Sequence, residues 1–111
     1  NKCCITHLAD THLLEACHII SWAEDESLRT NPTNGLCMNT LFHKAYDKLL
    51  MSITPDYQIC ISDGFIDSAK EDNVFCNYLV SLNNKAIAMP NRFQPNKEYL
   101  DSHYQKFRKS V

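Results

Sequence analysis

The sequence predicts an α+β domain in which two short strands and a helix are followed by a β-hairpin and a C-terminal helix. Residues 13–22 are apolar and rich in Leu and Ile, as in a partly buried strand. Residues 40–49 follow Asn39, a residue type that caps helices, and carry apolar side chains at helical spacing. Ile59 and Ile61 alternate with less apolar neighbours, which is typical of a hairpin strand.

A polar loop separates the first strand from the second. This loop, residues 23–33, ends in Asn31-Pro32-Thr33-Asn34-Gly35, which is a turn signal. Residues 35–38 then read as a short second strand. The helix begins at Thr40 and ends near Leu49 or Leu50, with Leu41 and Ala45 on its buried face. The resulting order is ββα. We expect Trp22, at the end of the first strand, to anchor packing.

The second half of the chain adds smaller elements. Turn residues, alternation and capping signals predict a hairpin at 50–54 and 57–62, a loop with a short turn of helix at 62–70, a last short strand at 86–89 and a helix at 96–108. Asn96 caps that last helix, and Leu100, Tyr104 and Phe107 form one stripe along it. We expect this stripe to pack against the hairpin.

The length and charge of the chain limit its functions. A chain of 111 residues is expected to form one domain, without room for a separate target-recognition domain. A formal net charge of −2 argues against strong non-specific binding to nucleic acid. Because the chain begins with Asn1 rather than methionine, we expect a processed chain or the C-terminal fragment of a longer protein, with its core motif in residues 13–49.

The cysteines suggest a reducing compartment. Six cysteines are too few for a disulfide scaffold of this length, and none are spaced as Cys-x-x-Cys, which common zinc-binding modules use. The sequence shows neither a signal peptide nor an apolar run of membrane length. We therefore expect a cytoplasmic protein that does not insert into a membrane and whose cysteines serve as small buried apolar residues.

His43 and Asp47 form the most informative pair in the chain. Four residues apart on a helix, they share one face, so an imidazole nitrogen and a carboxylate oxygen converge on one point. Such a pair suits a divalent cation. Asp47 has an alternative role in pairing with Lys44 or Lys48 on the helix surface. A second histidine, His18, lies in the first predicted strand, and its neutral imidazole can take a proton from water near pH 7.

These residues resemble the His-Asn-His (HNH) endonuclease motif with its ββα-metal fold. The variant that this chain resembles lies at the C-terminus of many bacterial restriction endonucleases. Its sequence contains, in order, the segments Cys-x-[Ile/Val]-Thr, Glu-Ala-Ala-His-Ile, Asn-Gly-Leu and His-x-x-Phe-Asp. In the same order, this chain has the four segments Cys4-Ile5-Thr6, Glu15-Ala16-Cys17-His18-Ile19, Asn34-Gly35-Leu36 and His43-Lys44-Ala45-Tyr46-Asp47. The nine-residue step from Asn34 to His43 is usual for the family, and segments 88–90, 94–100 and His103 resemble the tail that follows the motif.

The resemblance implies a role for each residue. His18 would be the general base, and Asn34 would tie the loop between the strands and hold the base strand over the metal helix. His43 and Asp47 would hold one divalent cation, with magnesium or manganese fitting a shell of His, Asp and water best and zinc or nickel as alternatives. The substrate would be double-stranded DNA, cut to 5′-phosphate and 3′-hydroxyl ends. A recognition domain would precede this chain. The resemblance is also compatible with a homodimer.

Cys17 departs from the usual motif. Many HNH enzymes place Asp or His before the base histidine as a metal ligand, whereas the variant resembled here often has Ala. A thiolate at this position would favour zinc. Because adjacent strand residues point to opposite faces, we expect Cys17 to face the core and His18 to face the metal helix.

The remaining polar residues leave two functions open. Lys44, Lys48 and Arg108 are the candidate contacts to DNA phosphates, although basic helix ends are more often simply solvated. His7, His12 and His103 are expected on the surface without a role. The first function is a metal-dependent HNH endonuclease of a restriction enzyme. The second is a ββα module that binds DNA or protein without turnover, which Cys17 and the near-neutral charge favour.

Overall fold

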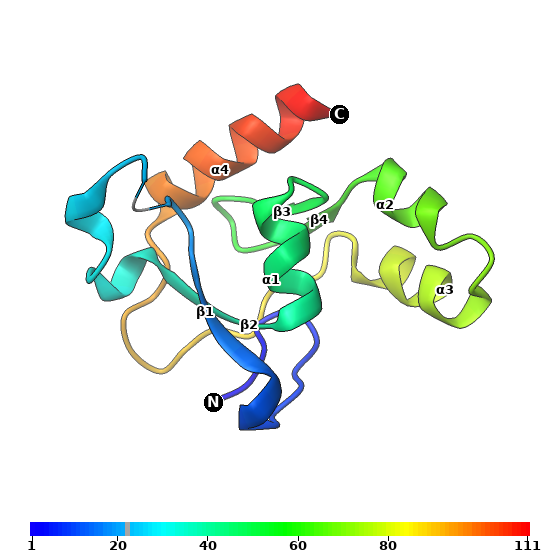
Figure 1. Ribbon diagram of the computed structural model, residues 1–111, viewed down its shortest axis with the longest axis horizontal. Helices are drawn as coiled ribbons and strands as arrows, with labels where there is room; N and C mark the ends of the chain where they lie inside the picture. Colours follow the sequence, from blue (N-terminus) through cyan, green and yellow to red (C-terminus); the bar gives the residue numbers. More distant parts are fainter. Residues whose placement is uncertain (22) are drawn as a thin grey trace.

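The predicted ββα unit lies at the centre of the molecule (Figure 1). The computed structural model describes residues 1–21 and 23–111, so the expected anchor Trp22 lies outside the described residues. Strand β1 (Leu14–His18) pairs antiparallel with β2 (Gly35–Asn39), and α1 (Thr40–Asp47) follows directly. Helix α1 begins where predicted, because the Asn39 side chain accepts a hydrogen bond from the Phe42 amide at 3.0 Å. The α+β fold class is confirmed.

One face of the β1–β2 sheet carries the core. Leu36 and Met38 of β2 are buried, and in the antiparallel register Cys17 lies opposite Leu36 on the same face. Helix α1 buries Phe42 and Tyr46 rather than the predicted Leu41, whose side chain is exposed. Aromatic side chains remove more apolar surface from water than Leu41 would, so they decide which face of α1 turns inward.

The predicted hairpin and last helix are also confirmed. Strands β3 (Met51–Ile53) and β4 (Ile59–Ile61) pair antiparallel, and α4 (Lys97–Ser110) packs on β3. The Asn96 side chain caps α4 by accepting from the amides of Glu98 and Tyr99. The chain also forms short 3-10 turns, η1 (Thr11–Leu13), η2 (Glu26–Leu28) and η3 (Pro32–Asn34).

Two parts of the second half differ from expectation. Helix α2 (Asp63–Ser68) matches the expected helical turn, but α3 (Asn73–Leu82) was not predicted; together they form a lobe away from β1 and β2 (Figure 1). The strand expected at 86–89 is reduced to an isolated bridge between Gln58 and Ala86. Within the described residues, none of the helices combines the length and apolar character needed to cross a bilayer.

His103 is buried, which corrects its assignment to the surface. Its Nε2–H donates to the Tyr46 carbonyl at 2.9 Å, so its Nδ1 accepts from the Ser52 hydroxyl at 2.7 Å. The ring also stacks on Tyr46 at 3.6 Å between centroids. The helical period explains the burial, because residue 103 lies on the same face of α4 as the buried Leu100 and Phe107. His103 therefore joins α1, β3 and α4.

We expect this contact to make folding stability sensitive to acid. Burial lowers the pKa of His103 below the ordinary value near 6.5, so the unfolded chain binds the proton more readily. The stabilisation is present above about pH 6.5 and is lost as pH falls toward the lowered pKa. Urea unfolding of wild type should show a lower free energy of unfolding at about pH 5.5 than at about pH 7.5.

His103→Gln should be less stable than wild type at neutral pH but should show a smaller drop on acidification. His12→Gln is the matched control, because the His12 side chain is exposed. An equal pH dependence in wild type and His103→Gln would contradict this account.

Candidate functional site

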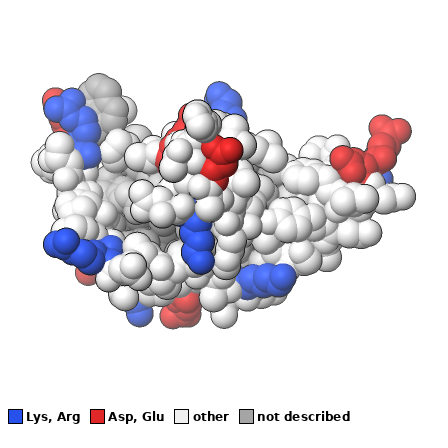
Figure 2. Space-filling model, turned by 90° about the horizontal axis from the view of Figure 1, so that it is seen from below, with Lys and Arg blue, Asp and Glu red and all other residues white. Residues whose placement is uncertain are grey.

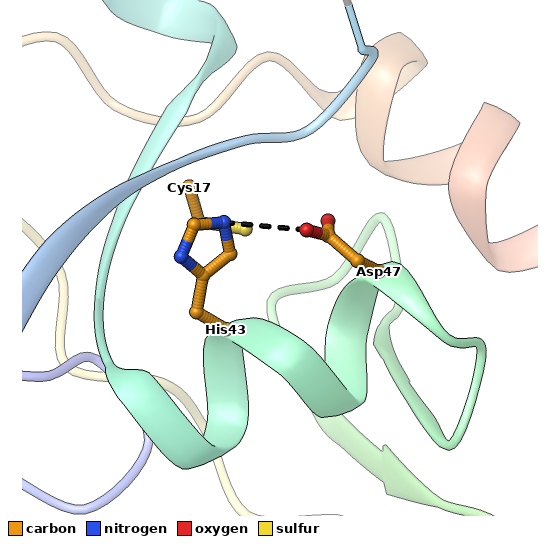
Figure 3. A group of neighbouring side chains, drawn as sticks. All are labelled: Cys17, His43 and Asp47. Carbon is orange, nitrogen blue, oxygen red and sulfur yellow. Dashed lines mark ion pairs between the residues drawn. The ribbon is translucent and has the colours of Figure 1, made fainter.

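Three ligand-type side chains meet between β1 and α1 (Figure 3). His43 Nε2 lies 3.4 Å from Asp47 Oδ2, which is the i, i+4 convergence that the sequence predicted. The Cys17 sulfur of β1 joins them, and one atom from each residue lies within 4.8 Å of the others. Figure 3 shows the sulfur beside the line that joins His43 to Asp47.

Glu15 orients His43 and was missed as a site residue. Its Oε1 lies 2.7 Å from His43 Nδ1, on the side of the ring away from Asp47. A carboxylate accepts hydrogen bonds, so in the neutral ring the proton sits on Nδ1 and the Nε2 lone pair points toward Asp47. Carboxylates support metal-binding histidines in this way. The alternation of β1 could have indicated Glu15, because it shares the face of Cys17.

The residues fit a divalent cation. Ligand atoms about 2.0–2.3 Å from one ion lie about 3 to 4 Å apart, which matches the distance from His43 Nε2 to Asp47 Oδ2. Burial, with the Asp47 carboxylate adding to it, raises the pKa of the Cys17 thiol. The sulfur is thus a neutral thiol at neutral pH in the metal-free protein. His43 and Asp47 supply nitrogen and oxygen ligands, and a thiolate at Cys17 would require a cation that displaces its proton.

His18 occupies a side of β1 other than the one expected. Cys17 is fully buried, as expected, but Glu15 and Cys17 are the residues that turn toward α1, whereas alternation places His18 on the other side of the strand. The expectation treated the core and the metal helix as lying on opposite faces. They lie on the same face, because α1 covers the sheet face that forms the core. A buried Cys17 therefore also borders the candidate metal ligands.

His18 lies at the end of β1 with a defined tautomer. Its Nε2–H donates to the Arg29 carbonyl at 2.9 Å, so in the neutral ring Nδ1 keeps its lone pair and can accept a proton. The side chain is partly exposed, and His18 and Asp47 both line one cavity of about 310 Å³. A candidate proton acceptor and a candidate metal ligand therefore border the same space.

Asn34 fastens the loop that follows β1. It is fully buried, and its amide group donates to the carbonyls of Ile20 and Leu28 while its oxygen accepts from the Ile20 amide at 2.8 Å. Its own carbonyl accepts from the Ile19 amide at 2.9 Å. These contacts hold the residues directly after His18, which matches the tying role that the resemblance implies.

The three candidate phosphate contacts are exposed but scattered. Lys44 lies on α1, Lys48 directly follows that helix, and Arg108 lies over the Tyr104 ring on α4 at 5.8 Å. Among the described residues, Asp47 forms its ion pair with His43, and not with Lys44 or Lys48 as the alternative role for Asp47 would require. Figure 2 shows a face that is mostly uncharged, with Lys and Arg spread around a hollow rather than gathered in one patch. A broad basic surface does not cover this face.

Comparison with known proteins supports the motif. The sequence profile described as HNH endonuclease matches residues 3–54, which contain β1, β2, α1 and β3. The curated proteins include no match to this chain. The matched region contains Glu15, Cys17, His18, Asn34, His43 and Asp47. Residues 3–54 of the chain, with the ββα unit at their centre, therefore belong to the HNH endonuclease family, which points to nuclease activity.

Proposed function

We propose that this protein hydrolyses phosphodiester bonds in DNA with the help of one divalent cation. The observation that carries the proposal is the convergence of His43 Nε2 and Asp47 Oδ2 beside a cavity that His18 also lines. The hydrogen bond from His18 to Arg29 supports the proposal, because it leaves Nδ1 available as a base. The contact of Glu15 with His43 supports it further, because it turns Nε2 toward a cation.

In the proposed reaction, His18 removes a proton from the attacking water. The water oxygen forms a bond to phosphorus, and the bond from phosphorus to the 3′ oxygen breaks with its electron pair left on that oxygen. The proton from water goes to His18 Nδ1, and the leaving oxygen takes a proton from solvent to give a 3′-hydroxyl opposite a 5′-phosphate. Asn34 holds the strand end, and the Arg29 carbonyl holds the His18 ring during this transfer.

His43 and Asp47 would hold the cation, with water and substrate oxygen completing its shell. When bound, the cation supplies charge that stabilises the transition state and the leaving oxygen. Magnesium or manganese suits this donor set, because the raised pKa of the Cys17 thiol disfavours a thiolate ligand. Zinc or nickel would be the alternative if Cys17 does ligate.

The resemblance extends the proposal to a restriction enzyme, in which a separate domain would select the DNA sequence. A methyltransferase gene beside the gene for this protein would support that assignment. The competing function is a ββα module that binds DNA or protein without cleaving it. Cys17 favours this second function, since many HNH enzymes have an acidic residue or histidine at that position. Plasmid nicking by the folded full-length protein with magnesium, manganese, nickel or zinc separates the two.

The first prediction from this proposed function concerns His18 as the base. His18→Ala should reduce the rate of plasmid cleavage by about 10²–10⁴-fold, because a positioned proton acceptor contributes about that much. Metal affinity and the free energy of unfolding should change little. His12→Ala is the control, because it removes an exposed imidazole that does not line the cavity. Equal cleavage rates for His18→Ala and His12→Ala would refute the assignment of His18.

A second prediction concerns the cation. His43→Ala and Asp47→Asn should each weaken manganese binding, measured by calorimetry, by more than about 100-fold, because even outer partners of metal ligands contribute about 10- to 100-fold. Glu15→Ala should weaken binding by about 10- to 100-fold, and Glu15→Gln, which keeps an acceptor oxygen, by less.

Asp10 and His12 supply a matched control for these metal measurements, since they form an exposed His–Asp pair at 2.9 Å. His12→Ala and Asp10→Asn should leave manganese affinity unchanged. If His43→Ala and Asp47→Asn behave like these controls, the i, i+4 pair is only a surface feature.

A third prediction concerns Cys17. Cys17→Ala should lower the free energy of unfolding by about 1 kcal/mol or more through lost packing, because the side chain is fully buried. The ratio of cleavage rates with magnesium and zinc should stay as in wild type. A selective loss of zinc-supported cleavage would instead identify the sulfur as a ligand.

A further inference from the structure

A cavity of about 310 Å³ adjoins the candidate metal ligands. His18 and Asp47 border it from β1 and α1, Glu24 from the loop after β1, and Ser102 and Lys106 from α4. Among its described lining residues, Lys106 supplies the one Lys or Arg side chain. Helix α4 follows the matched region 3–54, so the cavity combines that region with a part of the chain outside it.

Lys106 is held by Glu24 in this structure. The ammonium group of Lys106 donates to Glu24 Oε1 and joins α4 to the loop after β1. Both side chains are 47% exposed, and ion pairs with that exposure typically contribute little to stability. The pair can therefore be exchanged for another anion at little cost. A phosphate oxygen is a suitable substitute for the carboxylate oxygen.

We propose that this cavity binds a phosphodiester of the substrate strand, with Lys106 as its cationic ligand and Glu24 as the internal anion that occupies Lys106 until DNA arrives. The proposal rests on the proposed nuclease function. A phosphate in this cavity lies beside His18 and Asp47, so it is the phosphate next to the candidate metal centre. Asp47 and Glu24 are both negative, so attraction for phosphate in the metal-free protein depends on Lys106. The Ser102 hydroxyl is a second donor at the same wall.

If phosphate replaces Glu24 as the partner of Lys106, substitutions of these two residues should change DNA affinity in opposite directions. Lys106→Gln should raise the KM for plasmid cleavage, and the Kd for a short fluorescent duplex in EDTA at low salt, by about three- to tenfold with a smaller change in kcat. The slope of log affinity against log salt should fall by about one. Glu24→Gln should instead lower both KM and Kd, because it frees Lys106 and removes a negative charge.

Matched controls separate a local contact from net charge. Lys109→Gln removes the same charge from α4 outside the cavity lining, and Glu26→Gln removes a negative charge close to Glu24. The proposal requires Lys106→Gln and Glu24→Gln to exceed their controls in opposite directions. Changes equal to those of the controls would overturn it.

A purely structural ion pair would behave differently again. Both Lys106→Gln and Glu24→Gln would then lower the unfolding temperature and weaken DNA binding together, which would also overturn the proposal. If wild type cleaves and the cavity variants match their controls, the cavity assignment alone fails. If wild type does not cleave with any metal but the opposite Kd shifts persist, the nuclease function fails and the phosphate site stands.

Discussion

The pairing register of β1 with β2 decides which chemistry this fold can present. Because Cys17 lies opposite Leu36 and Glu15 opposite Met38, these side chains share the face that α1 covers. A slip of one residue would turn Ala16 and His18 toward the helix and would move the carboxylate and the thiol to the other side. The register is well fixed, since Cys17, which is fully buried, would lose its burial in such a slip. Packing energy and site geometry are therefore determined by the same hydrogen bonds.

His43 shows how this arrangement prepares a metal ligand before any metal binds. One carboxylate contacts each of its ring nitrogens, Glu15 at 2.7 Å and Asp47 at 3.4 Å. The shorter contact, from Glu15 on β1, is the better hydrogen bond, so it selects the tautomer of His43 that is protonated on Nδ1. The longer one comes from the next turn of the same helix and leaves room for a cation between nitrogen and oxygen. The negative charge of Glu15 also makes the imidazole a stronger electron donor.

Local signals in the sequence predicted the ββα core, and long-range packing explains what they missed. Asn39 and Asn96 predicted where α1 and α4 begin, because a side-chain cap depends on residues only two or three positions away. Helix α3 escaped prediction because Asn, Val, Phe, Cys and Tyr have weak helix propensity.

The roles of His103 and Glu15 were missed for a related reason, because both depend on contacts between distant parts of the chain. The burial of His103 depends on Ser52 and on the Tyr46 carbonyl, both more than fifty residues away in sequence. Motif spacing identified His18, Asn34, His43 and Asp47. Glu15 was missed because the face of β1 that carries Glu15 and Cys17 was expected to turn away from α1.

The loop between β1 and β2 links these features into one assembly. Asn34 fixes both Ile20 and Leu28, and the next residue after Leu28 supplies the carbonyl that orients His18. The same loop carries Glu24, whose side chain reaches Lys106 on α4. Displacing this loop would therefore disturb the proton acceptor and the cavity wall together, even though neither Asn34 nor Leu28 lines the cavity. A buried amide such as Asn34 suits this role, because each hydrogen bond that it lost would leave a backbone group near the core without its partner.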